Sequence, residues 1–258
     1  MTRIEIEGRD VVGIRAGNPG ALTLSGTNTW IVGRDPAWLI DPGPALADHL
    51  DALVAELAAR GGAGGIALTH DHHDHTEALP DLLARIGRVS VAAGRGVVDV
   101  ILGDGTRFGP LTSLPLPGHA PDHVVLLFAD VAFSGDAVLG EGSVFIAPDP
   151  GALRGYLAGL ARLRELRPTV LCPGHGPPVV DSVAKIDAYV AHRQAREDAL
   201  LASLDTGARS TAELLDAVWP DVPEVLRPAA AVTLAAHLDK LDEEGRLPPG
   251  VERPTLGL

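Results

Sequence analysis

A single cysteine, Cys172, occurs in the 258 residues. This excludes an internal disulfide framework and any zinc site built from several thiolates. Aromatic residues make up only 3% of the chain, and long apolar runs are missing. Runs such as Val124–Phe128 are far shorter than the ~18 apolar residues that a membrane helix needs. We therefore expect no membrane partner.

Positive charge is also scarce, because 21 basic residues stand against 34 acidic ones and the net charge is −13. Such a charge disfavours electrostatically driven binding to RNA, DNA or an anionic membrane. The first residues alternate in charge and lack the apolar segment of a secretory signal, which predicts a cytoplasmic protein. Hydrophobic residues reach 46%, enough for a sizeable buried core.

The first ~180 residues alternate short apolar runs with turns rich in glycine, proline, aspartate and histidine. Helical spacing of leucine, isoleucine and alanine occurs in 45–60, 77–86 and 151–166. Many short strands with interspersed helices predict an α/β fold of packed layers. Strands are expected at 4–6, 29–32, 38–40, 65–69, 88–92, 111–116, 124–128, 131–133 and 169–172.

The pattern changes after Pro178, where residues 182–204 are predicted to form one long helix. Helices at 210–218 and 223–241 and a short hairpin at 244–247 then outline a winged helix, with Ser210 and Glu213 as a capping box. We place a catalytic domain at 1–200 and the winged-helix-like domain at 201–258. The tail has ten acidic and five basic residues, which favours a structural role over DNA binding.

Histidine is abundant, and four of the ten histidines lie within the six residues from His70 to His75. The buried strand 65–69 leads directly into His70. Residues i and i+2 of an extended chain face the same way, so His70 and His72 can bind one metal ion. Asp74 and His75 fall in the following turn, where they can face a second ion nearby.

Three further donors follow predicted strands, each directly after a glycine: His119, Asp136 and His175. Strand-end loops of a layered α/β fold converge on one edge, where active sites form. Imidazole and carboxylate donors without thiolate suit two borderline divalent metals. An explanation by ordinary turn residues would have to account for all seven side chains at once.

This set of residues resembles the metallo-β-lactamase superfamily. The stretches 18–20, 26–30, 117–123, 133–142 and 173–177, and the segment His192-Arg-x-x-Arg-Glu197, are similar to the β-lactamase-like protein 2 group of that superfamily. The resemblance covers essentially the whole chain. It implies a four-layer αββα sandwich with a binuclear site between the sheets, followed by a small C-terminal winged-helix domain.

The resemblance also implies roles for individual residues. His70, His72 and His119 would hold one zinc ion, and Asp74, His75 and His175 the second, with Asp136 bridging them; Mn²⁺ and Fe²⁺ are alternatives to the two Zn²⁺. Asp74 and Asp136 are the expected catalytic carboxylates. Asn28 and Thr29 would line the substrate groove or close a turn, and His123 would contact substrate or support His119. Asp41 is expected to orient a ligand histidine.

Two such ions share a water and lower its pKa, so the nucleophile is expected to be a metal-bridging hydroxide. We favour a hydrolase of (thio)esters or related carboxylic substrates, from a small molecule or an acyl carrier. The alternative is a metal-dependent phosphodiesterase or single-strand endoribonuclease acting on RNA, which the net charge disfavours. A β-lactamase is disfavoured because such members generally lack an aspartate at the position of Asp136. A non-catalytic binding protein is disfavoured by the complete ligand set. A homodimer is compatible with the sequence.

Overall fold

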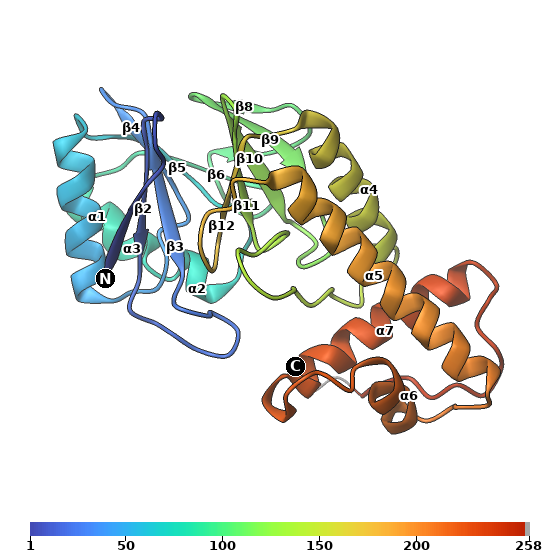
Figure 1. Ribbon diagram of the computed structural model, residues 1–258. Helices are drawn as coiled ribbons and strands as arrows, with labels where there is room; N and C mark the ends of the chain where they lie inside the picture. Colours follow the sequence, from blue (N-terminus) through green and yellow to red (C-terminus); the bar gives the residue numbers. More distant parts are fainter. Residues whose placement is uncertain (256–258) are drawn as a thin grey trace.

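The computed structural model describes residues 1–255, which form two facing sheets covered by helices on both outer sides (Figure 1). The first sheet has seven strands in chain order, antiparallel from β1 to β4 and parallel from β4 to β7. They are β1 (Thr2–Glu5), β2 (Val11–Arg15), β3 (Asn28–Val32), β4 (Ala37–Ile40), β5 (Ala63–Ala67), β6 (Ser90–Ala93) and β7 (Val100–Ile101).

The second sheet has five strands in the order β12-β11-β10-β9-β8, and only β11 and β12 pair in parallel. Helices α1 and α3 cover the first sheet, whereas α4 and α5 cover the second (Figure 1). The strands of the second sheet and the four covering helices have these bounds: β8 (Arg107–Phe108), β9 (Leu111–Pro115), β10 (Val124–Phe128), β11 (Val131–Gly135), β12 (Val170–Pro173), α1 (Ala47–Ala59), α3 (Leu79–Ile86), α4 (Ala152–Leu166) and α5 (Ser182–Asp205). The predicted αββα sandwich is confirmed.

The central strand β3 shows how the sequence builds these layers. Trp30 and Val32 face the second sheet, and Ile31 faces the layer that contains α1. This follows from the two-residue period of a strand, which sends alternate side chains to opposite faces. Gly13 on β2 lies opposite Trp30, and a Cβ there would come within 2.7 Å of the indole ring. Only glycine fits beneath this tryptophan.

Most predicted elements are found within a few residues of their expected bounds, and three short strands were missed. The glycine in Val11–Arg15 interrupts the β-branched run, which hid β2. Strands β7 and β8 have only two residues each, too few for a periodic signal. A helical turn, α2 (His73–Thr76), also begins four residues before the predicted helix, so Asp74 and His75 lie on helical backbone.

The C-terminal residues form helices α6 (Thr211–Val218), η1 (Glu224–Leu226) and α7 (Arg227–Glu243). The capping box of Ser210 and Glu213 is confirmed. Leu200 and Leu204, at the end of α5, pack in the apolar cluster of this tail. The predicted domain boundary at residue 200 therefore falls inside one continuous helix and stays a prediction.

The expected hairpin at Glu244–Leu247 is wrong, because the described residues after α7 contain no strand. Gly245 ends the helix with a φ of +66°, and the prolines that follow have no N–H to donate to a strand partner. Instead, the amide of Glu252 donates to the carbonyl of Arg209, and the Glu252 side chain accepts from the amide of Thr211. The segment is thereby held against the start of α6.

The tail packs against the sandwich through α7. The amide of Ile146 donates to Thr233, and Glu243 accepts from the amide of Gly151 and from Arg154. Ile146 and Gly151 lie in the connection between β11 and α4, beside the loops at the strand ends. Within residues 1–255, no helix combines the length and the hydropathy that a membrane span needs.

Candidate metal centre

The predicted metal ligands come from four separate segments that end at the same edge of the two sheets. His70 and His72 lie between β5 and α2, and His119 follows β9. Nε2 of His119 is 2.9 Å from Nδ1 of His72, and the ring centroids of His70 and His72 are 4.5 Å apart. One donor atom from each of these three histidines lies within 4.8 Å of the other two.

A second group of donors lies on α2 and after β12. Nε2 of His75 is 3.3 Å from Nε2 of His175, and Nε2 of His175 is 3.3 Å from Oδ2 of Asp74. Donor atoms of Asp74, His75 and His175 also lie within 4.8 Å of one another. The two groups contain six of the seven predicted ligands and share none.

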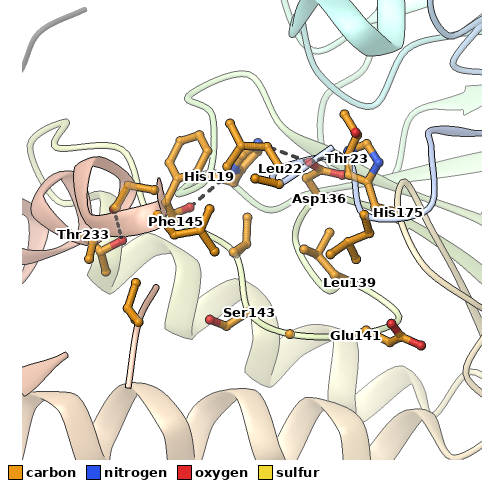
Figure 2. A pocket seen from close by; sticks show the side chains of 18 of the residues that line it. Leu22, Thr23, His119, Asp136, Leu139, Glu141, Ser143, Phe145, His175 and Thr233 are labelled. Atoms are coloured by element: carbon orange, nitrogen blue, oxygen red, sulfur yellow. Dashed lines mark hydrogen bonds and ion pairs between the residues drawn. The ribbon is translucent and has the colours of Figure 1, made fainter. Parts of the chain in front are cut away.

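Asp136, at the end of β11, lies between these groups. Its Oδ2 is 3.6 Å from Nε2 of His119 and 3.3 Å from Nε2 of His175, and Figure 2 shows the three side chains together. Its Oδ1 is 3.5 Å from Nε2 of His75. The carboxylate thus contacts one member of the first group and two of the second.

The donor set fits metal ions. Nε2 of His70 and Oδ1 of Asp136 are buried without a hydrogen-bond partner among the described residues. Buried polar atoms are nearly always paired, so these two call for a partner that the chain does not supply. Imidazole nitrogens that face each other, as in His75 and His175, are the arrangement expected around a shared cation. Five imidazoles and two carboxylates are donors that suit zinc and iron.

Charge divides the cluster into two halves. Burial by itself lowers the pKa of His75 and of His175, but Asp136 outweighs burial at both. The pKa of His75 is raised well above its usual value, and the pKa of His175 is raised to about 9. Burial instead dominates at His70, whose pKa falls well below its usual value, and lowers the pKa of His119 to about 4. Metal ions bind neutral imidazoles, so a metal ion in this half of the cluster would compete with protons for His75 and His175.

The two carboxylates keep their charge. Burial raises the pKa of Asp136, but His175 and His75 outweigh it and hold this pKa well below its usual value. Burial acts in the same way on Asp74, where the hydrogen bond to His175 and the charge of His75 bring the pKa down to about 2. Asp74 also accepts a hydrogen bond from the hydroxyl of Thr27 at 2.9 Å, which fixes its Oδ2.

Asp41 orients His75, as the sequence predicted. Its Oδ2 accepts from Nδ1 of His75 at 2.9 Å, which leaves Nε2 to face the cluster. The same carboxylate accepts from the amide and the hydroxyl of Thr69, each at 2.7 Å. The Thr69 hydroxyl is in turn 3.0 Å from Nδ1 of His70. Asp41 therefore holds histidines of both donor groups, one directly and one through Thr69.

The structure places the three candidate substrate contacts, Asn28, Thr29 and His123, inside the fold. Asn28 and Thr29 are fully buried, because β3 is an interior strand of its sheet. Asn28 donates to the carbonyls of Pro173 and Gly176, and Thr29 contacts Nε2 of His49. Asn28 thus braces the loop that carries His175. His123 is also buried, and its Nε2 accepts from the amide of Asp136 at 3.1 Å, so it supports Asp136 in place of His119.

A cavity of about 640 Å³ opens beside the cluster, between the sandwich and the tail. Figure 2 shows Leu139 and Phe145 in this cavity beside His119 and Asp136. Its wall is mainly hydrocarbon and includes, besides donors of the cluster, residues from three parts of the structure. They are Leu22, Leu24, Leu139, Val144 and Phe145 from the sandwich, Arg193 and Arg196 from α5, and Trp219, Val222, Leu226, Ala229, Ala230 and Thr233 from the tail.

Comparisons with known proteins agree with this architecture. A model of the metallo-beta-lactamase superfamily matches residues 97–175, and a model of the beta-lactamase associated winged helix domain matches residues 210–247. The beta-lactamase-like protein 2 homolog of Drosophila melanogaster is 32% identical over 268 residues, which cover 92% of this chain and 89% of the relative. An atrochrysone carboxyl ACP thioesterase of Aspergillus chevalieri is 33% identical over 237 residues, covering 83% and 74%.

Two solved structures extend the similarity. A metallo-beta-lactamase family protein from Thermus thermophilus is 26% identical, with a TM-score of 0.73 over 92% of this chain and 94% of that one. A protein solved in a di-iron-bound form is 28% identical, with a TM-score of 0.53 over 66% and 95%. The chain forms a sandwich with histidine and aspartate donors at one edge, carries a winged-helix tail and matches relatives along nearly its full length. These findings establish that the chain belongs to the metallo-beta-lactamase superfamily of metal-dependent hydrolases.

Proposed function

We propose that this chain is a binuclear zinc hydrolase of carboxylic thioesters and esters, acting on a small-molecule or acyl-carrier substrate. The observation that carries this proposal is the position of the donor cluster at one side of a cavity lined mainly by hydrocarbon. An apolar wall stabilises an acyl group by removing it from water. The similarity to a protein named as a thioesterase supports the same choice.

We assign His70, His72 and His119 to one ion, Asp74, His75 and His175 to the other, and Asp136 to both. The grouping of donor atoms supports this assignment, because the first six residues fall into these two sets of three. Asp136 forms a further group with His70 and His75, one residue from each set. Zinc is proposed on the donor chemistry, and metal analysis of the purified protein distinguishes zinc from iron or manganese.

Divalent ions held by these residues would polarise the carbonyl oxygen of the substrate and lower the pKa of the attacking water. The chain itself orients the groups around this reaction. Thr27 occupies Oδ2 of Asp74, and no hydrogen bond within residues 1–255 occupies Oδ1. Asp74 lines the cavity in its ionised form, so Oδ1 can accept a hydrogen bond from the attacking water and orient it. Leu139 and Phe145 supply apolar wall for the acyl group beside the donors.

RNA fits this cavity less well than an acyl group does. A polyanion is bound through many lysine and arginine side chains, and the cavity has only Arg193 and Arg196 of these types in its described wall. Arg196 is already paired with Asp221 at 2.8 Å. The chain as a whole carries a net charge of −13. These charges favour a carboxylic substrate over a phosphodiester.

A parallel assay tests the proposal. The zinc-loaded protein is offered an acyl-CoA thioester, a lactone, bis(p-nitrophenyl) phosphate and single-stranded RNA, with His70→Ala as the blank. We expect turnover of the thioester that is lost in the blank. Cleavage of RNA that is lost in the blank, without turnover of the thioester, would overturn the proposal in favour of a phosphodiesterase.

A further inference from the structure

The segment His192-Arg-x-x-Arg-Glu197 lies on α5, where it borders the cavity. Its first arginine, Arg193, is only 2% exposed, yet it lines the cavity that also reaches the donor cluster. A guanidinium is permanently charged, so its burial requires compensation by neighbouring groups. The surroundings of Arg193 therefore decide whether its charge is already used within the fold.

The contacts of Arg193 leave its charge without a countercharge. One terminal nitrogen donates to the carbonyl of Val144, and the guanidinium lies 5.7 Å from the ring centroid of Tyr156. Its Nε is buried and has no hydrogen-bond partner among the described residues. No ion pair within residues 1–255 involves Arg193.

The other charged residues of the segment are paired. Arg196 forms two hydrogen bonds with the carboxylate of Asp221, both of 2.8 Å, and lies over Trp219. Glu197 is bound by Lys240 at 2.8 Å and by Arg246 at 3.1 Å. These two residues fasten α5 to the tail. Arg193 is different, because its charge lies next to the cavity and is unmatched.

The loop beside the cavity connects Arg193 with the metal centre. Arg193 binds the carbonyl of Val144, and His119 binds the next carbonyl along the chain, that of Phe145. The cationic side chain and the candidate metal ligand thus hold consecutive residues of one loop. Val144 and Phe145 supply apolar wall between them. A ligand that spans the two sites must be apolar in its middle and polar at both ends.

We propose that Arg193 binds a carboxylate at the far end of the acyl group, so that the preferred substrates are thioesters or esters of acids with a second carboxylate. This inference rests on the proposed function, since it specifies the acyl group hydrolysed at the metal centre. A carboxylate matches the guanidinium in charge and in hydrogen-bonding geometry. An anionic group could also come from the phosphates of a carrier, and the experiment separates these two sources.

The experiment compares monothioesters of adipic acid with thioesters of hexanoic acid, which have the same chain length and lack the second carboxylate. Each acyl group is offered on coenzyme A and on N-acetylcysteamine, which has no phosphate. We expect at least a tenfold higher kcat/KM for the adipoyl compounds on both carriers. A preference that follows coenzyme A and ignores the acyl group would overturn the proposal.

Variants then assign the preference to one side chain. Arg193→Gln keeps an N–H donor for the carbonyl of Val144 but removes the charge, and it should reduce the adipoyl preference to less than threefold. Arg193→Lys keeps a charge and should retain part of the preference. The matched control is Arg196→Gln, which removes an already paired charge from the same cavity and should retain the wild-type preference. Equal losses on both acyl groups in Arg193→Gln would contradict the proposal.

Binding provides a readout independent of turnover. Calorimetric titration of adipate and hexanoate into the protein, with zinc and after chelation, should show tighter binding of adipate that depends on Arg193. If adipate binds in this way but no thioester is hydrolysed, the anion site stands and the proposed function fails. Suppose instead that both acyl thioesters are hydrolysed equally and that adipate binding is the same in Arg193→Lys, Arg193→Gln and the wild type. This result would overturn the anion site and support the proposed hydrolase function.

Discussion

The hydroxyl of Thr233 on α7 accepts a hydrogen bond from the amide of Ile146 at 3.2 Å. The carbonyl of the same peptide group, that of Phe145, accepts from Nδ1 of His119 at 3.2 Å. Figure 2 shows Phe145 between Thr233 and His119. A single peptide group therefore connects the tail to a candidate metal ligand. The contact fixes the Nδ1 proton of His119 and leaves its Nε2 to face the cluster.

Replacing Thr233 by valine keeps the shape of the side chain but removes the hydroxyl. The amide of Ile146 would then be buried without a partner, which costs about 1–3 kcal/mol of stability. We expect kcat to fall several-fold as well, because the peptide that orients His119 is released. Urea unfolding and steady-state kinetics measure the two effects. Thr233→Ser should restore both, and a loss of stability with unchanged kcat would show that the connection does not reach the site.

Asp41→Asn should weaken metal binding without removing a ligand. The amide side chain cannot offer two negatively charged oxygens to His75 and Thr69, and such supporting contacts are typically worth about 10–100-fold in metal affinity. Competition with a chromophoric chelator measures this loss. Asp71→Asn is the control from the same histidine-rich segment, because Asp71 is paired with Arg95 at the surface. Equal metal affinity in both variants would contradict the role of Asp41.

Gly174→Ala should disrupt the centre by sterics alone. A Cβ at this position would come within 2.4 Å of Oδ1 of Asp136 and 2.6 Å of Cε1 of His75. Both side chains must then move, so we expect metal occupancy to fall and activity to drop by more than about 100-fold, the effect typical of lost electrostatic stabilisation. Elemental analysis gives the occupancy. The control is Gly17→Ala, whose added Cβ meets nothing within 4 Å.

His237 should make stability depend on pH. It is buried on α7, and both ring nitrogens lack a hydrogen-bond partner among the described residues. Burial, followed by the charges of Arg193 and Lys240, lowers its pKa to about 3. Between this value and the ordinary histidine pKa of about 6.5, the unfolded chain binds the extra proton, so stability is lost as the pH falls.

The contribution of His237 to this loss is about 2 kcal/mol between pH 7 and pH 5. Urea unfolding at the two pH values measures the total loss in the wild type. His237→Leu removes the titrating group at similar volume and should lose correspondingly less stability over the same interval. Identical losses in the two proteins would show that the proton of His237 is not the cause.

The residue pattern was sufficient to predict a layered α/β fold and the cluster of donors, whereas the four-layer sandwich was implied by the resemblance to the metallo-β-lactamase superfamily. Apolar runs that end in His70, His119, Asp136 and His175 indicate both where a strand lies and where it ends. The strand ends of a layered sheet meet at one edge. Local spacing carries this information, so it can be read without knowing how distant segments pack.

The substrate side of the site could not be predicted in the same way. Phe145, Trp219 and Thr233 face the cavity only because α7 docks against the loop after β11. The periodicity of apolar residues along the sequence does not predict how α7 docks against this loop. For Asn28 and Thr29 the resemblance left a place in the substrate groove and a place in a turn open, and the interior position of β3 directs their side chains into the fold.

Helix α5 runs without a break from the sandwich into the tail (Figure 1). Its Ile186 and Tyr189 belong to the core of the sandwich, whereas Leu200 and Leu204 belong to the core of the tail. A continuous helix that packs into both cores provides no hinge between the sandwich and the tail. The part of the cavity wall that the tail supplies is therefore held in place by the core of the sandwich, so a substitution in either core can alter the shape of the cavity.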